Sequence, residues 1–256
     1  MIAHHPPGDL ATLYYDTITG ARRLNTDYLH ICDGGPSLAL AVADGDGDHA
    51  DAAQVAQITA QIAAAVASST GVPVEGLRAA RTYVEQRNML APACREGVST
   101  ATVVAINRHR GVSLAWAGDT AAWGITPRGE VVALTEPCCP PRSTPCHVTR
   151  QHAGLLPHSR TVGIEQFRRL VVTTSGLAVH LRPQRGDDTP AADRIGTLAG
   201  THEDGGYALA QLLWLAERSA DPGNATVAVI DLLDHHRATT TTTTTIAATT
   251  REDCLR

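Results

Sequence analysis

The chain has 256 residues, 43% of them hydrophobic, and a formal net charge of −5 at pH 7. That length is enough for one large domain with a buried core. All 21 basic residues are arginines scattered along the chain, so no basic field would attract nucleic acid, and no apolar run reaches the roughly 20 residues that cross a bilayer. The first ten residues, MIAHHPPGDL, lack the layout of a signal peptide. We therefore expect a cytoplasmic protein that binds neither nucleic acid nor a membrane; its alanine and arginine content without lysine fits a GC-rich bacterial genome.

The first half of the chain combines short apolar runs with two longer stretches in which apolar residues recur at helical spacing. The runs have the length of strands, and the longer stretches have the length of helices. The elements predicted for this half are strands over Leu13–Thr19, Tyr28–Cys32 and Leu38–Ala43, and helices over Ala50–Ser68 and Val74–Leu90.

The second half begins with closely spaced β-rich runs joined by short turns, which predict an antiparallel meander. Residues 136–166 are rich in Pro, His, Arg and Ser without periodicity, so we expect one long loop there. Residues 234–256 contain seven successive threonines and little apolar mass, which predicts a disordered tail after a domain that spans residues 1–233. The predicted elements are strands over Ala101–Asn107, Val112–Ala117, Ala121–Ile125, Val131–Leu134, Leu170–Thr174 and Ala225–Leu232, and helices over Pro190–Ala199 and Gly206–Ser219.

Six cysteines in a chain without a secretory signal are better explained as free thiols than as a disulfide framework. The segment CCPPRSTPCH, Cys138 to His147, places three thiols and an imidazole close together. Structural zinc sites usually use CxxC pairs, and this spacing differs from them. A proline-stiffened loop is therefore favoured over a zinc site.

An acidic turn, VADGDGDH from Val42 to His49, joins a predicted strand to a predicted helix. Asp44, Asp46 and Asp48 within it could bind a metal ion, or they could only form a turn and place negative charge at the beginning of the helix.

This turn is one of several short stretches that occur in a distinctive order. The others are GARRLNTDYL at 20–29, WAGDTAAW at 116–123, TTSGL at 173–177 and GNATVAV at 223–229. Together they resemble the metal-dependent PPM (type 2C) serine/threonine protein phosphatases, whose patterns run RxxNED, VADGMGGH, GDSRAY, SDGL and DNxTV. The resemblance covers nearly all of the chain before the tail. It implies an α+β fold, a four-layer αββα sandwich of two antiparallel sheets flanked by helices.

The resemblance also implies a chemistry for these residues. Two divalent ions, Mn²⁺ or Mg²⁺, would activate a water that attacks the phosphorus of a phosphoprotein directly. Asp44 would bridge the two ions, the carbonyl of Gly45 would ligate one of them, and Asp119 would help to hold a third ion. Arg22 would bind the substrate phosphate through its planar guanidinium. Asp27 would belong to the metal site and, with His49, would lie in its outer part.

The sequence departs from the family pattern at the metal ligands. Ser175 stands where the family has the aspartate of SDG, Gly223 stands where it has the aspartate of DNxTV, and Thr26 replaces the glutamate of NED. Losing two of three shared carboxylates removes two negative charges from a site that must offset about four positive charges. Asp46, Asp48 and Asp221 are nearby acids that would have to compensate.

Two functions therefore remain. The favoured one is a pseudophosphatase that keeps the cleft and Arg22 to bind or regulate phosphoproteins. The alternative is an active Mn²⁺- or Mg²⁺-dependent phosphatase that hydrolyses phosphate monoesters through a metal-activated water. Two residues also have simpler explanations, since Arg22 could be an ordinary surface charge and Asp119 could cap a turn.

Overall fold

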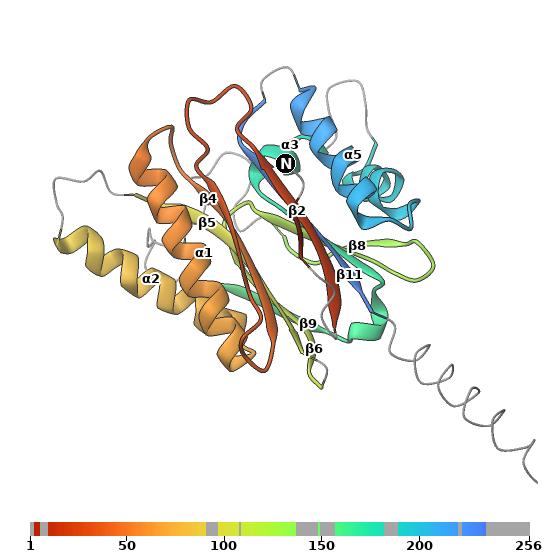
Figure 1. Ribbon diagram of the computed structural model, residues 1–256, viewed down its shortest axis with the longest axis horizontal. Helices are drawn as coiled ribbons and strands as arrows, with labels where there is room; N and C mark the ends of the chain where they lie inside the picture. Colours follow the sequence, from red (N-terminus) through yellow and green to blue (C-terminus); the bar gives the residue numbers. More distant parts are fainter. Residues whose placement is uncertain are drawn as a thin grey trace, which may run out of the picture.

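Two antiparallel sheets lie face to face, and helices cover their outer faces, in the computed structural model of the chain (Figure 1). The structure describes residues 3–5, 10–90, 97–107, 109–136, 148, 157–181, 189–219 and 222–233. The predicted tail, the cysteine-rich segment 138–147 and Asp221 lie outside these residues. Within them, no helix combines the length and the apolar character that a membrane span requires.

The first sheet has six strands in the order β1-β2-β11-β10-β7-β8. All of its neighbouring strands pair antiparallel, with β11 in register with β2 along its whole length. The strands are β1 (Ala3–His5), β2 (Ala11–Ile18), β7 (Ala121–Ile125), β8 (Val131–Ala133), β10 (Arg169–Thr173) and β11 (Ala225–Leu232).

The second sheet has five strands in the order β3-β4-β5-β6-β9, again all antiparallel. Its register places Asp44 between Asp27 on one neighbouring strand and Thr100 on the other. The strands are β3 (Asp27–Cys32), β4 (Leu38–Gly45), β5 (Ser99–Asn107), β6 (Gly111–Ala117) and β9 (His158–Val162).

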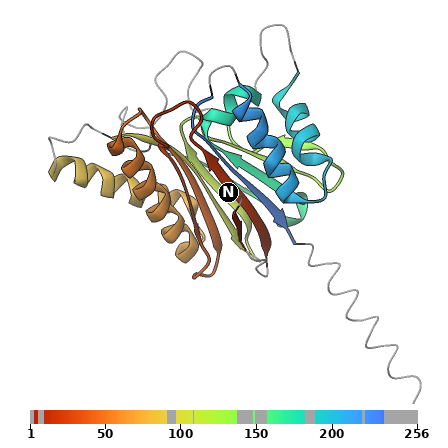
Figure 2. The same ribbon diagram turned by 45° about the horizontal axis from the view of Figure 1, so that its top comes forward.

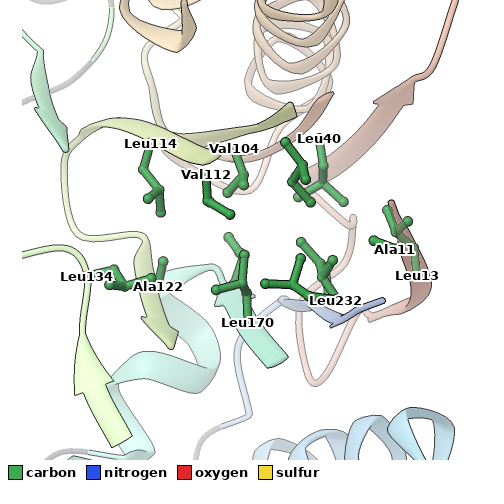
Figure 3. Close-up of a cluster of buried hydrophobic side chains, with 14 of the residues drawn as sticks. Ala11, Leu13, Leu40, Val104, Val112, Leu114, Ala122, Leu134, Leu170 and Leu232 are labelled. Carbon is green, nitrogen blue, oxygen red and sulfur yellow. The ribbon is translucent and has the colours of Figure 1, made fainter. Parts of the chain in front are cut away.

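Alternating side chains of both sheets meet between them and form the central core (Figure 3). Leu40, Val104 and Leu114 come from the second sheet and face Leu13 and Leu170 of the first, all of them at most 2% exposed. Burial of these side chains stabilises the sandwich, since each fully buried aliphatic side chain contributes about 1.5–3 kcal/mol.

Helices α1 (Ala50–Thr70) and α2 (Pro73–Leu90) cover the outer face of the second sheet, as two views show (Figures 1 and 2). The face of α1 that contacts this sheet is almost entirely alanine, which lets the helix lie close to the strands. The ring of His49 accepts a hydrogen bond from the N–H of Ala52 and caps the beginning of α1, and Gly71 ends it in a left-handed conformation at φ 71°.

The opposite outer face is covered by helices that follow β10 in the chain (Figure 1). They are α3 (Ser175–Leu181), α4 (Ala191–Ile195), the π-helical turn η2 (Gly196–Gly200) and α5 (Gly205–Glu217). The predicted four-layer αββα architecture is therefore confirmed.

The predicted meander over residues 101–134 is wrong as a single unit. β5 and β6 pair in one sheet, but the chain then crosses at 118–120 to the other sheet, where β7 pairs with β8 and β10. Strand spacing alone carries no signal for such a crossing, because both sheets contribute apolar faces to the same core.

The predicted loop over residues 136–166 contains a strand, β9, and a short 3-10 helix, η1 (Ile164–Gln166). β9 is an edge strand whose first four residues are exposed, so it lacks the alternation of apolar residues that reveals a half-buried strand. Helix α3 was also missed, because its seven residues are too few to show a helical period.

Candidate functional site

A cleft of about 370 Å³ opens at the ends of β4 and β10 and the beginnings of β3 and β5. It gathers almost all of the residues that the sequence singled out, from segments up to 200 residues apart. Its lining includes Arg22, Thr26, Asp44, Gly45, Asp46, Thr100, Asp119, Ser175, His180, Gly223 and Asn224. The side chain of Asp27 lies directly beside it, in contact with Asp44.

Asp44 is the next to last residue of β4 and lies at the centre of the site. The Ser175 hydroxyl, at the beginning of α3, donates a hydrogen bond of 2.6 Å to its Oδ2. Burial raises the pKa of Asp44 to about 6, and the nearby charges of Asp119 and Asp46 act in the same direction. The hydrogen bonds from Ser175 and Asp27 oppose that shift. The hydrogen-bonding neighbours of Asp44 in the cleft are thus the side chains of Ser175 and Asp27.

Asp27 is a buried partner of Asp44, only 6% exposed. Burial raises its pKa well above the ordinary range, and the charge of Asp44 raises it further. Its Oδ2 accepts a hydrogen bond of 2.7 Å from the Thr174 hydroxyl. Its Oδ1 is buried and has no hydrogen-bond partner among the described residues. Burial therefore favours the protonated form of both carboxyls over the ionised form.

Thr26 and Asn224 form a second buried pair at the base of the cleft. Oδ1 of Asn224 accepts hydrogen bonds from both the backbone N–H and the hydroxyl of Thr26, at 3.0 and 2.9 Å. Its Nδ2 donates to the carbonyls of Thr19 and Leu24. Thr26, which replaces a glutamate of the family pattern, is therefore committed to a structural contact.

Asp46 and Asp48, two of the acids that could compensate for the missing carboxylates, have different surroundings. The carboxylate of Asp48 accepts hydrogen bonds from the backbone N–H groups of Arg23 and Leu24 and is thereby directed toward that loop. Asp46 and Asp119 line the cleft and act electrostatically on Asp44. His49, expected in the outer part of the site, caps helix α1.

Gly45 and Gly223 occupy different surroundings. A Cβ added to Gly45 would lie 2.3 Å from the backbone oxygen of Ala52, so a glycine is required for the close approach of α1. A Cβ added to Gly223 would have no atom within 4 Å, so this position has room for a side chain.

Thr100 and Thr174 are polar residues of the site whose contacts the sequence did not reveal. Thr174 links Asp27 to the backbone N–H of Thr226 on β11. Thr100 lines the cleft, and its buried hydroxyl has no hydrogen-bond partner in the described part of the chain. The pairing of Thr100 with Asp44 depends on strand register, which only the assembled sheet defines.

The side chains at the centre of the cleft differ from the ligands that a pair of metal ions requires. Two adjacent dications require several carboxylates in their common coordination sphere. In the described residues, no group of three or more His, Cys, Asp or Glu side chains is arranged to hold a metal ion. At the centre of the cleft, hydroxyl groups of Ser175 and Thr174 instead donate to the two carboxyls.

The sequence matches no protein-family model and no curated protein. Several solved structures are similar to it over most of its length. The serine/threonine phosphatase PstP/Ppp of Mycobacterium tuberculosis is 18% identical, with a TM-score of 0.68 over 88% of this chain and 100% of that one. The PPM Ser-Thr phosphatase MsPP of Mycobacterium smegmatis is 21% identical, with a TM-score of 0.66 over 88% and 100%. RsbX is 15% identical, with a TM-score of 0.64 over 91% and 100%.

These likenesses define the fold as that of the PPM-type serine/threonine phosphatases. Two of the solved neighbours contain metal: a PstP catalytic domain holds two manganese ions, and the RsbX structure holds magnesium.

Proposed function

We propose that this chain is a pseudophosphatase, a phosphatase-fold protein with a depleted metal centre that binds or regulates phosphoproteins without hydrolysing them. The observation that carries the proposal is the 2.6 Å hydrogen bond from the Ser175 hydroxyl to Asp44. A hydroxyl at that position brings no negative charge, and its proton occupies a lone pair of Asp44 that a cation would need.

Two further features support a loss of turnover. Burial raises the pKa of both Asp27 and Asp44 and so opposes the doubly ionised pair that a binuclear centre needs. Gly223 supplies no side chain at all. This donor set does not fit two adjacent dications, so no hydrolytic step is assigned to it.

Binding of a phosphorylated partner rests on Arg22 and the open cleft. Arg22 is exposed and lines the cleft, and a guanidinium can donate two parallel hydrogen bonds to a phosphate. We also infer that the phosphatase-like domain spans residues 1–233 and that 234–256 is an extension of it.

An active enzyme with a modified Mn²⁺ or Mg²⁺ centre is the second candidate. It is favoured by Asp46 and Asp119, whose charges both act on Asp44 from within the same cleft. In this case Asp27, Asp44, Gly45 and Asp119 would form the ligand set.

The deciding experiment follows dephosphorylation of a phosphothreonine peptide by the purified protein across a Mn²⁺ titration, with Asp44→Ala as the control. Background rates in both proteins at every Mn²⁺ concentration, together with measurable binding of the phosphopeptide over its unphosphorylated form, support a pseudophosphatase. Turnover that depends on Mn²⁺ and disappears in Asp44→Ala would establish the enzyme instead.

A further inference from the structure

The loop between β2 and β3, residues 19–26, carries Arg22 to the rim of the cleft. Residues 20–24 are exposed, and even the apolar side chain of Leu24 belongs to a residue that is 42% exposed. An exposed loop of this kind has little apolar burial to fix its conformation, so its hydrogen bonds determine where Arg22 lies.

The first part of the loop is held by the segment that precedes β11. Gly20 adopts φ 61°, and a Cβ there would lie 2.3 Å from the carbonyl oxygen of Pro222. The N–H of Ala21 donates to that same oxygen at 2.7 Å. The carbonyl of Leu24 accepts a hydrogen bond from Asn224 at 3.0 Å.

The second part is held by an acid from the turn between β4 and α1. Oδ2 of Asp48 accepts the N–H of Arg23 at 3.3 Å, and Oδ1 accepts the N–H of Leu24 at 3.0 Å. Both oxygens of one carboxylate thus bind the two consecutive amides that follow Arg22. Asp48 lies only four residues after Asp44, so the same turn that carries the central carboxylate also fixes the loop that carries the arginine.

We propose that Asp48 is a positioning residue that holds Arg22 in place for a phosphate in the cleft. The inference rests on the proposed phosphoprotein binding and deepens it. Asp48 does not touch the phosphate; it restrains the backbone beside Arg22, which reduces the conformational entropy that the arginine loses when a phosphate binds. This role explains an extra acid in the signature turn that a metal centre does not require.

If Asp48 positions Arg22, its removal should change the affinity for a phosphopeptide in the opposite direction to that expected from its charge alone. Removal of a negative charge near a bound phosphate should tighten binding, but loss of the restraint on Arg22 should weaken it. We expect Asp48→Ala to weaken binding of a fluorescent phosphothreonine peptide about threefold to tenfold, measured by anisotropy. Asp48→Asn keeps one acceptor oxygen and should recover part of that loss.

Asp46→Asn is the matched control, because it removes one charge from the same turn and leaves both hydrogen bonds between Asp48 and the loop in place. It should tighten binding slightly, because it removes a negative charge that lines the cleft and leaves the loop restrained. In an Arg22→Ala background, Asp48→Ala should have no further effect on affinity. An equal loss in both backgrounds, or a weakening by Asp46→Asn equal to that by Asp48→Ala, would overturn the role.

Backbone dynamics of the ligand-free protein test the proposal even if no peptide binds. ¹H–¹⁵N NMR should show rigid amides at Arg23 and Leu24 in the parent protein and mobile ones in Asp48→Ala, with the melting temperature of both proteins unchanged. Equal mobility in both proteins, or global unfolding of Asp48→Ala with failure of Asp48→Asn to restore order, would reject the proposal. Rigid amides without any phosphopeptide binding would reject the proposed function instead.

Discussion

The hydroxyl of Ser175 donates a 2.6 Å hydrogen bond to Oδ2 of Asp44, across 131 residues of sequence. It joins the beginning of α3, on one sheet's side of the sandwich, to the end of β4 in the other sheet. The group that contacts Asp44 from the other side of the cleft is therefore a neutral hydroxyl.

Restoration of the two missing carboxylates should create a site for Mn²⁺. Ser175→Asp places a second carboxylate against Asp44, and Gly223→Asp adds a third at a position with no atom within 4 Å of a new Cβ. Without a cation these charges repel one another, so the double variant should melt below the parent protein.

Addition of Mn²⁺ should then raise the melting temperature of the double variant by several degrees, because a ligand bound only to the folded state stabilises it by about 2.7 kcal/mol at 100 times its Kd. Calorimetry with and without Mn²⁺ measures this shift. Ser175→Ala combined with Gly223→Ala is the control and should not respond. An equal response of the parent protein would argue that its own centre is intact.

The pH dependence of folding should reveal the raised pKa of Asp44. A carboxyl with a folded pKa of about 6 and an ordinary unfolded pKa near 3.8 binds more protons in the folded state between these values. Stability from this group is complete below the unfolded pKa and is lost as the pH rises through the folded one, by up to about 3 kcal/mol. The raised pKa of Asp27 extends the loss to higher pH.

Asp44→Asn removes this titration. The difference in unfolding free energy between Asp44→Asn and the parent should therefore shift in favour of the variant between pH 4 and 7. Urea denaturation at several pH values measures that difference, from which the titration of groups that do not interact with Asp44 cancels. A difference that is flat over this range would mean that Asp44 keeps an ordinary pKa.

The sequence predicted most of the architecture because the relevant signals are local. The continuous apolar runs of β4 and β11 and the helical spacing in α1 each depend only on neighbouring residues. The crossing of the chain between β6 and β7 and the exposed edge strand β9 were not predicted, because both depend on partners distant in sequence.

The composition of the cleft was predicted better than its hydrogen bonds. The motifs named Arg22, Asp44, Asp119 and Ser175, and all four line one cleft. The bond of Asp48 to the Arg22 loop and the bond of Thr26 to Asn224 were not predicted, because each depends on side-chain directions that the fold alone fixes. These residue types are compatible with metal binding, turns or caps, and only the three-dimensional contact selects among them.

Arg169 should be essential for folding although it belongs to none of the predicted site motifs. It is fully buried, and its guanidinium binds both oxygens of Asp231 and the carbonyls of Ala199, His202 and Glu203.

Arg169→Met leaves those acceptors without donors, so we expect a loss of about 3–5 kcal/mol in the free energy of unfolding, measured in urea. Arg218→Met is the control: Arg218 lies over the half-exposed ring of Trp214, and its loss should cost about 1 kcal/mol or less. Equal costs for the two variants would show that the buried network contributes little.

Gly176 and Gly223 form a matched pair for testing how closely the cleft is packed. A Cβ at Gly176 would lie 1.8 Å from the carbonyl oxygen of Asn224, which is backbone and cannot rotate away, whereas a Cβ at Gly223 meets nothing within 4 Å. Gly176→Ala should therefore force α3 away from β11 and lengthen the bond from Ser175 to Asp44.

We expect Gly176→Ala to cost about 3 kcal/mol, at the upper end for overpacking, and Gly223→Ala to remain within about 0.5 kcal/mol of the parent protein. Urea denaturation gives both values. Since Asn224 also holds Thr26 and the carbonyl of Leu24, the displacement in Gly176→Ala should reach the Arg22 loop and weaken phosphopeptide binding as well. If Gly176→Ala lost stability but bound the phosphopeptide as tightly as Gly223→Ala, the loop would be held independently of Asn224, and Asp48 alone would suffice to position Arg22.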